Sequence, residues 1–221
     1  MFGEPEFHDR REAGQRLAAR LQRFAADRPL VLALPRGGVP LGYEVAQALG
    51  AELDVLIVRK LGAPGHEELG IGAVIDGGNP QVVLNEDVVR QLGIGPAYVE
   101  AETQRQLAEI ERRRRAYRGD APAPGVAGRT VIVVDDGIAT GGTVLAALRA
   151  LRKAGPLKLV LAVPVAPAET ITALAGECDE IICLTQPTPF YAVGAHYANF
   201  HQTSDHEVIA LLEQASRLKP A

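Results

Sequence analysis

The segment from residue 131 to residue 143 constrains the fold of this chain more than any other. It reads Val-Ile-Val-Val-Asp-Asp-Gly-Ile-Ala-Thr-Gly-Gly-Thr. Four branched apolar residues in succession predict a strand that is buried on both faces, as strands of parallel sheets are. Residues 144–153 then have the composition and spacing of a helix. The segment therefore predicts strand, loop and helix, with two carboxylates at the strand end, where ligands bind in open α/β sheets.

The loop of this segment, residues 137–143, has the composition of a phosphate-binding loop. Its three glycines let the main chain approach a ligand, and the helix that follows offers unpaired N–H groups and a positive dipole end. Asp135 and Asp136 precede the loop and can accept hydrogen bonds from sugar hydroxyls. Hydroxyl acceptors beside a phosphate-binding loop indicate a sugar-phosphate site.

Two common nucleotide-binding patterns do not fit this loop. Gly137 and Gly142 have the spacing of the P-loop glycines, but Thr143 stands where a P-loop has its lysine, so a nucleoside triphosphatase is excluded. The glycine spacing also differs from the dinucleotide-binding pattern. The remaining alternative is a glycine-rich strand-to-helix turn that binds nothing.

The segment closely resembles the phosphoribosyl-pyrophosphate (PRPP) binding motif of type I phosphoribosyltransferases. The resemblance implies that Asp135 and Asp136 hold the ribose 2′- and 3′-hydroxyls and contact Mg²⁺ indirectly, since PRPP itself supplies many of the metal's ligands. It also implies that the loop binds the 5′-phosphate. The loop residues are Gly137, Ile138, Ala139, Thr140, Gly141, Gly142 and Thr143.

The resemblance and the apolar runs together imply an α/β fold, with a mostly parallel twisted sheet, helices on both faces and an irregular hood. We expect a single domain over residues 1–221 with its core at about 30–185. The other expected parts are a flexible loop at about 61–81, a helical insertion at about 96–118 and a hood at 186–206, to which the N-terminus can add.

A second candidate site follows the apolar run 30–34. There Arg36 offers a permanently charged planar fork for phosphate, and Gly37 and Gly38 expose N–H groups beside it. Type I phosphoribosyltransferases carry a pyrophosphate-binding loop at this position, often with a strained peptide. The alternative is a tight turn with a solvated arginine.

A third candidate site is Arg59-Lys60, which follows a predicted strand at 53–58. The resemblance implies that a basic residue here contacts pyrophosphate, and that residues 61–75, with His66, Glu67 and Glu68, close over the reaction. Glycines and prolines in 61–81 predict a mobile excursion or a hairpin rather than a packed element. The alternative is a surface loop with a packed arginine stem.

Other residues give weaker signals. Consecutive strand residues point to opposite faces, which argues against Asp135 and Asp136 sharing a proton. Phe190, Tyr191 and Tyr197 either stack on the acceptor or pack the core of the hood. The run Arg112–Arg115 fits a solvated helix face or a dimer contact.

Composition limits the partners. A net charge of −4 gives no electrostatic reason to expect nucleic acid, and no apolar run is long enough to span a membrane. The N-terminus lacks the features of a signal peptide, so we expect a cytoplasmic protein. Cys178 and Cys183 are expected on opposite faces of one strand, as buried thiols without a disulfide. A homodimer is expected only because symmetric dimers are the commonest oligomers.

We therefore expect an enzyme that displaces pyrophosphate from PRPP with a nitrogen nucleophile of a small molecule such as a nucleobase. Asp135, Asp136, Arg36 and Lys60 are the predicted catalytic residues, with Mg²⁺ bound together with PRPP. Ala139 replaces an acid of the hypoxanthine–guanine enzymes, so the motif is closer to the adenine and orotate types. The alternatives are a regulatory module that senses PRPP or a nucleotide, and a hydrolase that needs no acceptor.

Overall fold

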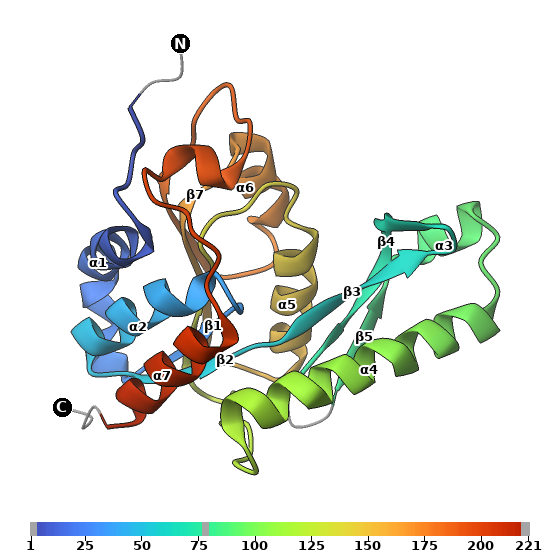
Figure 1. Ribbon diagram of the computed structural model, residues 1–221, viewed down its shortest axis with the longest axis horizontal. Helices are drawn as coiled ribbons and strands as arrows, with labels where there is room; N and C mark the ends of the chain where they lie inside the picture. The colour runs from blue at the N-terminus through green and yellow to red at the C-terminus, as the bar shows by residue number, and fades with distance from the viewer. Residues whose placement is uncertain (1–3, 77–79, 218–221) are drawn as a thin grey trace.

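The computed structural model describes residues 4–76 and 80–217, and its centre is a five-stranded parallel sheet (Figure 1). The strand order is β2-β1-β6-β7-β8, and each neighbouring pair is parallel. The predicted α/β fold with a mostly parallel sheet is confirmed. The strands are β1 (Leu30–Ala33), β2 (Glu52–Val55), β6 (Thr130–Val134), β7 (Lys158–Val165) and β8 (Glu180–Thr185).

Helices cover both faces of this sheet, which is why its central strands are uniformly apolar. Alternate residues of β6 face opposite sides. Ile132 and Val134 pack with α1 (Arg10–Leu21) and α2 (Gly38–Leu49), whereas Val131 and Val133 pack with α5 (Gly142–Lys153) and α6 (Ala168–Leu174). These four side chains are fully buried, and each contributes roughly 1.5–3 kcal/mol of transfer free energy.

The segment expected to be mobile is largely packed. It forms a three-stranded antiparallel sheet of β3 (Val58–Ala63), β4 (His66–Ile75) and β5 (Gln81–Leu84). The prediction of a hairpin is correct and the prediction of an unpacked excursion is wrong, because Leu61, Ile71 and Val74 are buried against α4 (Pro96–Arg118) and α7 (Asp205–Ser216). Residues 77–79 of the predicted loop lie outside the described residues.

The predicted strand 53–58 is in fact two strands. β2 ends at Val55, and β3 begins at Val58 in the second sheet. Arg59 and Lys60 therefore lie inside β3, and the prediction that they follow a core strand is wrong.

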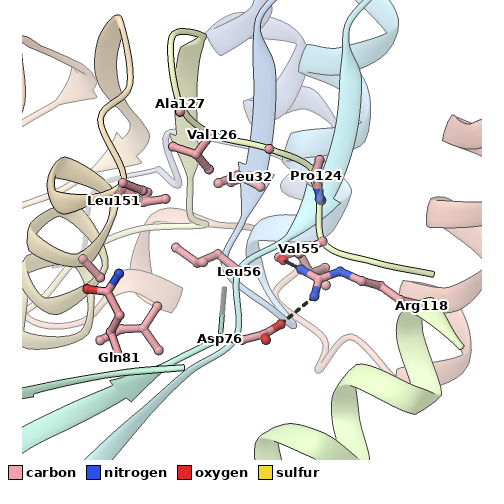
Figure 2. A pocket seen from close by; sticks show the side chains of 15 residues that line it. Leu32, Val55, Leu56, Asp76, Gln81, Arg118, Pro124, Val126, Ala127 and Leu151 are labelled. Atoms are coloured by element: carbon pink, nitrogen blue, oxygen red, sulfur yellow. Dashed lines mark hydrogen bonds and ion pairs between the residues drawn. The ribbon is translucent and has the colours of Figure 1, made fainter. Parts of the chain in front are cut away.

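A buried arginine joins the two sheets at this point. Arg118, the last residue of α4, donates through Nε to both carboxylate oxygens of Asp54, at 2.9 and 2.8 Å. Its Nη1 donates to Asp76 at 2.6 Å and its Nη2 to the carbonyl of Val55. Because only 6% of the Arg118 side chain is exposed, this cluster fixes the base of the hairpin sheet to β2. Figure 2 shows Arg118 and Asp76 at the rim of an apolar cavity of about 390 Å³.

The remaining elements are helical. The helix α1 ends at Leu21 and continues as a 3₁₀ helix, Gln22–Asp27. The helix α7 near the C-terminus begins with a capping box, formed by Ser204 and Glu207. There are also two further short helices. They are α3 (Glu86–Gln91) and the 3₁₀ helix Val193–His196.

The two cysteines do not share a strand, contrary to the prediction. Cys178 precedes β8, and Cys183 lies within it. Both thiols are free, and burial raises the pKa of each to about 11. Within residues 4–76 and 80–217, no helix is both long and apolar enough to cross a membrane.

Candidate functional site

The loop between β6 and α5 surrounds a small cavity of about 130 Å³ at the first turn of α5. Gly141 precedes the helix with φ of +78°, a left-handed conformation that favours glycine. The buried Ile138 anchors the loop, because its N–H donates to the carbonyl of Val165 at 2.9 Å. The cavity is lined by Asp135, Gly137, Ile138, Ala139, Thr140, Gly141, Gly142, Thr143 and Val144. The structure thus brings all seven predicted loop residues around one cavity.

Two carboxylates lie directly beside this loop. β6 ends at Val134, so Asp135 and Asp136 follow the strand and do not alternate across it. The Asp136 N–H donates to the Asp135 carboxylate at 2.9 Å. Burial, followed by the charge of Asp136, raises the pKa of Asp135 well above its usual range. The charge of one carboxyl group therefore acts on the other, and the premise that Asp135 and Asp136 alternate across a strand is wrong, because β6 ends before them.

Arg10 is a residue of this site that sequence reasoning missed. Its Nε donates to Asp136 Oδ2 at 2.8 Å, and its Nη2 lies 2.8 Å from the same oxygen. Its Nη1 donates to the carbonyl of His201 at 2.6 Å, and its guanidinium lies 3.9 Å from the ring centroid of Phe200. Only 12% of the Arg10 side chain is exposed. Burial raises the pKa of Asp136, and Arg10 opposes that rise.

The loop that carries Arg36 packs directly against the acidic pair. The peptide between Pro35 and Arg36 is cis. A Cβ at Gly37 would lie 2.0 Å from Asp136 Oδ2, and a Cβ at Gly38 would lie 2.6 Å from the Val134 carbonyl. Only glycine fits at these two positions without a shift of the neighbouring loop. The two glycine-rich loops therefore form one contiguous structure.

The predicted roles within this second loop need one correction. The N–H of Gly38 is not available to a ligand, because it donates to the carbonyl of Leu34 at 3.0 Å. The Arg36 side chain is 33% exposed, and its Nη1 lies 3.8 Å from Asp205 Oδ1. The loop of Arg36 thus packs against Asp136, while the Arg36 side chain itself faces the carboxylate of Asp205 from α7.

Arg59 and Lys60 point in different directions, as neighbouring strand residues do. Arg59 donates through Nε to Gln106 Oε1 of α4 at 2.9 Å. Lys60 instead lines a cavity of about 740 Å³ that is also lined by Thr140 and Gly142 of the loop between β6 and α5. The structure therefore brings Lys60 to the site and directs Arg59 to α4.

The three candidate aromatic residues have separate environments. Tyr197 is 4% exposed, and its hydroxyl donates to the Asp136 carbonyl at 2.6 Å, so it packs the hood and holds the acidic pair. Burial raises the pKa of Tyr197 strongly. Phe190 stacks on His196 with ring centroids 5.6 Å apart. Tyr191 is 69% exposed, which leaves it the most accessible of the three for contact with a ligand.

The N-terminal residues belong to the same assembly. Phe7 pairs with Tyr197 in a parallel bridge, donating to the His196 carbonyl at 2.9 Å and accepting from Ala198 at 2.8 Å. The Phe7 ring lies 5.4 Å from that of Tyr197. Residues 7–10 and 196–201 are thus joined beside Asp136.

Comparison with known proteins identifies the class. A family model described as "Phosphoribosyl transferase domain" matches residues 6–198 of this chain. The chain belongs to that family. The matched range includes the acidic pair, both glycine-rich loops, the hairpin sheet and α4, but it ends before α7.

Two relatives are similar over nearly the whole chain. Rv0571c of Mycobacterium tuberculosis strain H37Rv, named "Putative phosphoribosyl transferase", is 47% identical over 211 residues, which are 96% of this chain and 47% of that protein. The chain thus spans about half the length of this curated relative. The crystal structure of TT1426 from Thermus thermophilus is 42% identical with a TM-score of 0.83, and the match covers 95% of this chain and 98% of that one.

A more distant structure shares the fold alone. It is a hypothetical protein from Neisseria gonorrhoeae that was crystallised with bound ppGpp. It is 11% identical with a TM-score of 0.51, and the match covers 96% of this chain and 98% of that one.

Proposed function

We propose that this chain catalyses the displacement of pyrophosphate from C1 of PRPP by a nitrogen nucleophile of a small-molecule acceptor. One observation carries the proposal. The cavity at the first turn of α5 adjoins the Asp135–Asp136 pair, and the Arg36 loop packs against that pair without room for a Cβ. A phosphate site, hydroxyl acceptors and a second cationic site therefore adjoin one another in the order that phosphate, ribose and pyrophosphate take in PRPP.

The phosphate-binding loop anchors the 5′-phosphate in this proposal. The N–H groups at the start of α5 and the hydroxyls of Thr140 and Thr143 are the donors, and the helix dipole favours the phosphate charge. The loop is fixed at both sides, since Thr170 donates to the Ala139 carbonyl at 2.7 Å and Ile138 donates to Val165. A fixed phosphate holds C1 in a constant position during the reaction.

The acidic pair binds the ribose hydroxyls. The transition state of this displacement carries positive charge on the ribose ring, and nearby carboxylates stabilise that charge. Arg10 keeps one carboxylate oriented, because it contacts Asp136 through two nitrogens. Arg10 then acts on the substrate only through Asp136, as a positioning residue.

Arg36 and Lys60 stabilise the departing pyrophosphate in this proposal. Arg36 follows a strand of the core sheet, and its loop packs against Asp136. Lys60 lies in the hairpin sheet, and it lines a cavity together with residues of the phosphate-binding loop. The hairpin between β3 and β4, residues 61–75, covers the reacting groups and excludes water, which would otherwise hydrolyse the donor. The exposed Leu69 lies on this hairpin.

Mg²⁺ fits the donor chemistry of this site. Asp135 and Asp136 supply the oxygen ligands that Mg²⁺ prefers, while the phosphates of the donor can supply the others. When bound, the ion would neutralise pyrophosphate charge. Within residues 4–76 and 80–217, no group of three or more His, Cys, Asp or Glu side chains is placed to hold a metal ion without such help.

The acceptor in this proposal is a nucleobase or a similar nitrogen heterocycle, bound beside the hood. The exposed Tyr191 offers a ring for stacking. Ala139 offers no carboxylate to move a proton on a purine, which favours acceptors that need no such acid.

A non-catalytic sensor of PRPP or a nucleotide is the second candidate. The observation that favours it is the ion pair of Arg10 with Asp136, which engages one of the two ribose acceptors in this structure. The two functions differ in turnover, because a sensor binds PRPP without releasing pyrophosphate.

The test combines binding and turnover. Thermal unfolding with PRPP and Mg²⁺ is expected to show stabilisation, by about 2.7 kcal/mol at a hundred times the dissociation constant. Pyrophosphate release is then measured with a panel of nitrogen bases and without any base. The double variant Asp135→Asn, Asp136→Asn is expected to abolish release. Binding without release from any base supports the sensor, release without a base supports a hydrolase, and full activity of the double variant contradicts the proposal.

A further inference from the structure

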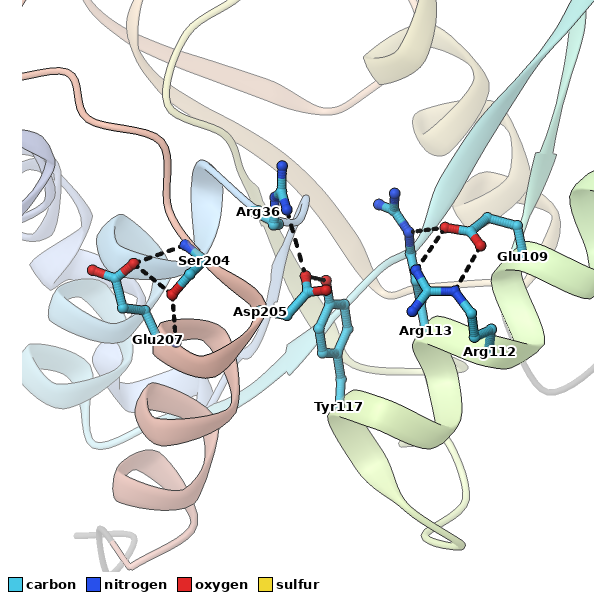
Figure 3. Close-up of polar contacts among 8 residues, drawn as sticks. All are labelled: Arg36, Glu109, Arg112, Arg113, Tyr117, Ser204, Asp205 and Glu207. Carbon is cyan, nitrogen blue, oxygen red and sulfur yellow. Dashed lines mark hydrogen bonds and ion pairs between the residues drawn. The ribbon is translucent and has the colours of Figure 1, made fainter.

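Below Arg36, the end of α4 meets the start of α7, and the contact between them is polar (Figure 3). The Tyr117 hydroxyl donates to Asp205 Oδ1 at 2.6 Å. The same oxygen lies 3.8 Å from Arg36 Nη1. Tyr117 is 7% exposed, so the Asp205 carboxylate is held from below by a buried phenol and faces Arg36 above.

A second arginine reaches this junction from α4. Arg113 lies four residues before Tyr117, which places both on one face of the helix. Its Nε donates to Glu109 at 2.7 Å, which fixes the side chain. Among the residues that the structure describes, none accepts a hydrogen bond from its two Nη groups. Figure 3 shows the Arg113 guanidinium projecting to the same side as that of Arg36.

The charges of both arginines act on the same phenol. Burial and the Asp205 carboxylate raise the pKa of Tyr117 to about 12, and the charges of Arg113 and Arg36 oppose that rise. The geometry agrees, because Arg36 faces the carboxylate oxygen that Tyr117 contacts, and Arg113 lies one helical turn from Tyr117.

Positive charge is in excess at this junction. Arg36, Arg112 and Arg113 face only the carboxylates of Glu109 and Asp205 among the described residues. Glu109 is shared by two arginines, since Arg112 donates to it through Nε and Nη2 at 2.8 and 2.9 Å. An anion with several oxygens can use the donors that remain, and a guanidinium fork suits phosphate geometry.

We propose that Arg113 is a second arginine of the subsite that Arg36 begins, and that this subsite binds the pyrophosphate group of the donor. The inference rests on the proposed function and adds a residue from α4. Asp205 is the counter-charge that Arg36 faces in this structure, and an incoming pyrophosphate competes with it.

Burial distinguishes Arg113 from Arg115 of the same run, while Arg114, which is 30% exposed, lines a separate cavity with Asp76 and Arg118. The Arg115 side chain is 72% exposed and pairs with Glu111, as expected for a solvated helix face. The Arg113 side chain is 23% exposed. Within one run of four arginines, position 113 is thus turned toward the junction, and position 115 is turned toward solvent.

Calorimetric titration with inorganic pyrophosphate in Mg²⁺ tests this inference, with ribose 5-phosphate as the second probe. Arg113→Gln is expected to weaken pyrophosphate binding roughly tenfold, the effect of one charge-assisted hydrogen bond. Ribose 5-phosphate binding is expected to stay unchanged, because that ligand occupies only the loop and the acids. The matched control Arg115→Gln removes the same charge from the same helix and is expected to change neither affinity.

Arg36→Gln separates the inference from the proposed function. Weakening by Arg36→Gln together with full affinity of Arg113→Gln would overturn the inference and leave the proposed function intact. Equal loss of both ligands in Arg113→Gln would also overturn it, since that result indicates a structural role. A wild-type protein that binds neither probe would instead overturn the proposed function. Melting curves of each variant confirm that it folds.

Discussion

The two sides of the acidic pair are built in different ways. On one side, the loop between β6 and α5, which is proposed to bind phosphate, is a single stretch of chain whose conformation is set by glycine and by the start of α5. On the other side, charged side chains come from separate segments of the chain: Arg10 pairs with Asp136, and Arg36 faces Asp205 near Arg113. The loop side is formed by consecutive residues, whereas the geometry of the charged side depends on how helices and sheets pack together.

This difference implies that substitutions far from the loop can change ligand binding by the charged residues without changing ligand binding by the loop. A main-chain site is insensitive to most side-chain changes. A site built from side chains of several distant elements changes when a substitution shifts any one of those elements. The following predictions test this division, beginning with the largest expected effect.

Replacing Arg10 with Gln is expected to lower the free energy of unfolding by about 3 kcal/mol, because it leaves a largely buried carboxylate at Asp136 without its charged partner. Urea denaturation measures the effect. Arg11→Gln is the matched control, since the Arg11 side chain is 75% exposed and its loss is expected to cost less than about 1 kcal/mol. Equal stability of the two variants would show that the N-terminal segment is not part of the charged side.

Replacing Gly37 with Ala is expected to destabilise the protein by about 2 kcal/mol and to weaken ribose 5-phosphate binding, because the new Cβ would lie 2.0 Å from Asp136 Oδ2. Gly176→Ala is the control, since its Cβ would meet no described atom within 4 Å. If Gly37→Ala changed pyrophosphate binding and left ribose 5-phosphate binding unchanged, the two sides would be less closely connected than this contact indicates.

Replacing Asp135 with Asn is expected to stabilise the protein without substrate at neutral pH while impairing activity. The pKa of Asp135 is raised in the folded state, so the folded protein retains this proton when the unfolded chain has lost it. The contribution of Asp135 to wild-type stability therefore falls as pH rises above about 3.8. Asp135→Asn removes this contribution, and its melting temperature at pH 7 should exceed that of wild type by on the order of 2–4 °C. A lower melting temperature at pH 7 would contradict the expectation.

Replacing Asp205 with Asn is expected to strengthen pyrophosphate binding by roughly threefold, because the side chain can still accept the Tyr117 hydroxyl but no longer competes for Arg36. Asp87→Asn is a suitable control, since the Asp87 side chain is 87% exposed and pairs with Arg90. Weaker pyrophosphate binding in Asp205→Asn would mean that Asp205 orients Arg36 rather than competing with the ligand.

The same division explains what the sequence could predict. The strand, acidic pair, loop and helix of 130–153 are contiguous, so local patterns were sufficient for the core and the phosphate-binding side. The apolar run 53–58 does not reveal the break between β2 and β3, because periodicity alone cannot divide a short apolar run. For this reason the sequence pattern places Arg59 and Lys60 after a core strand, whereas both lie within β3.

Sequence patterns do not reveal most of the charged residues that come from separate segments. Arg10 and Asp136 are 126 positions apart, and no local pattern distinguishes Arg10 from Arg11. Asp205 stands at the start of α7, and no motif around it points to Arg36. Arg113 stood in a run of four arginines whose members differ only once α4 is packed against α7. Their roles follow from tertiary contacts, which a single sequence does not encode in its spacing.

The buried cluster of Arg118, Asp54 and Asp76 has a mechanical consequence for the hairpin sheet. The hairpin sheet resembles a beam that is clamped at one end: the buried cluster holds its base, and the turn at Pro64 and Gly65 at its other end is exposed. A loaded beam of this kind bends where its cross-section is weakest, and the register shifts between Leu61 and Ala63 interrupt the pairing of β3 with β4. Bending of the hairpin is therefore expected beyond Leu61, where Tyr98 of α4 supports the strand by donating to the Gly62 carbonyl at 3.0 Å, and Lys60, nearer the fixed end, is expected to keep its position.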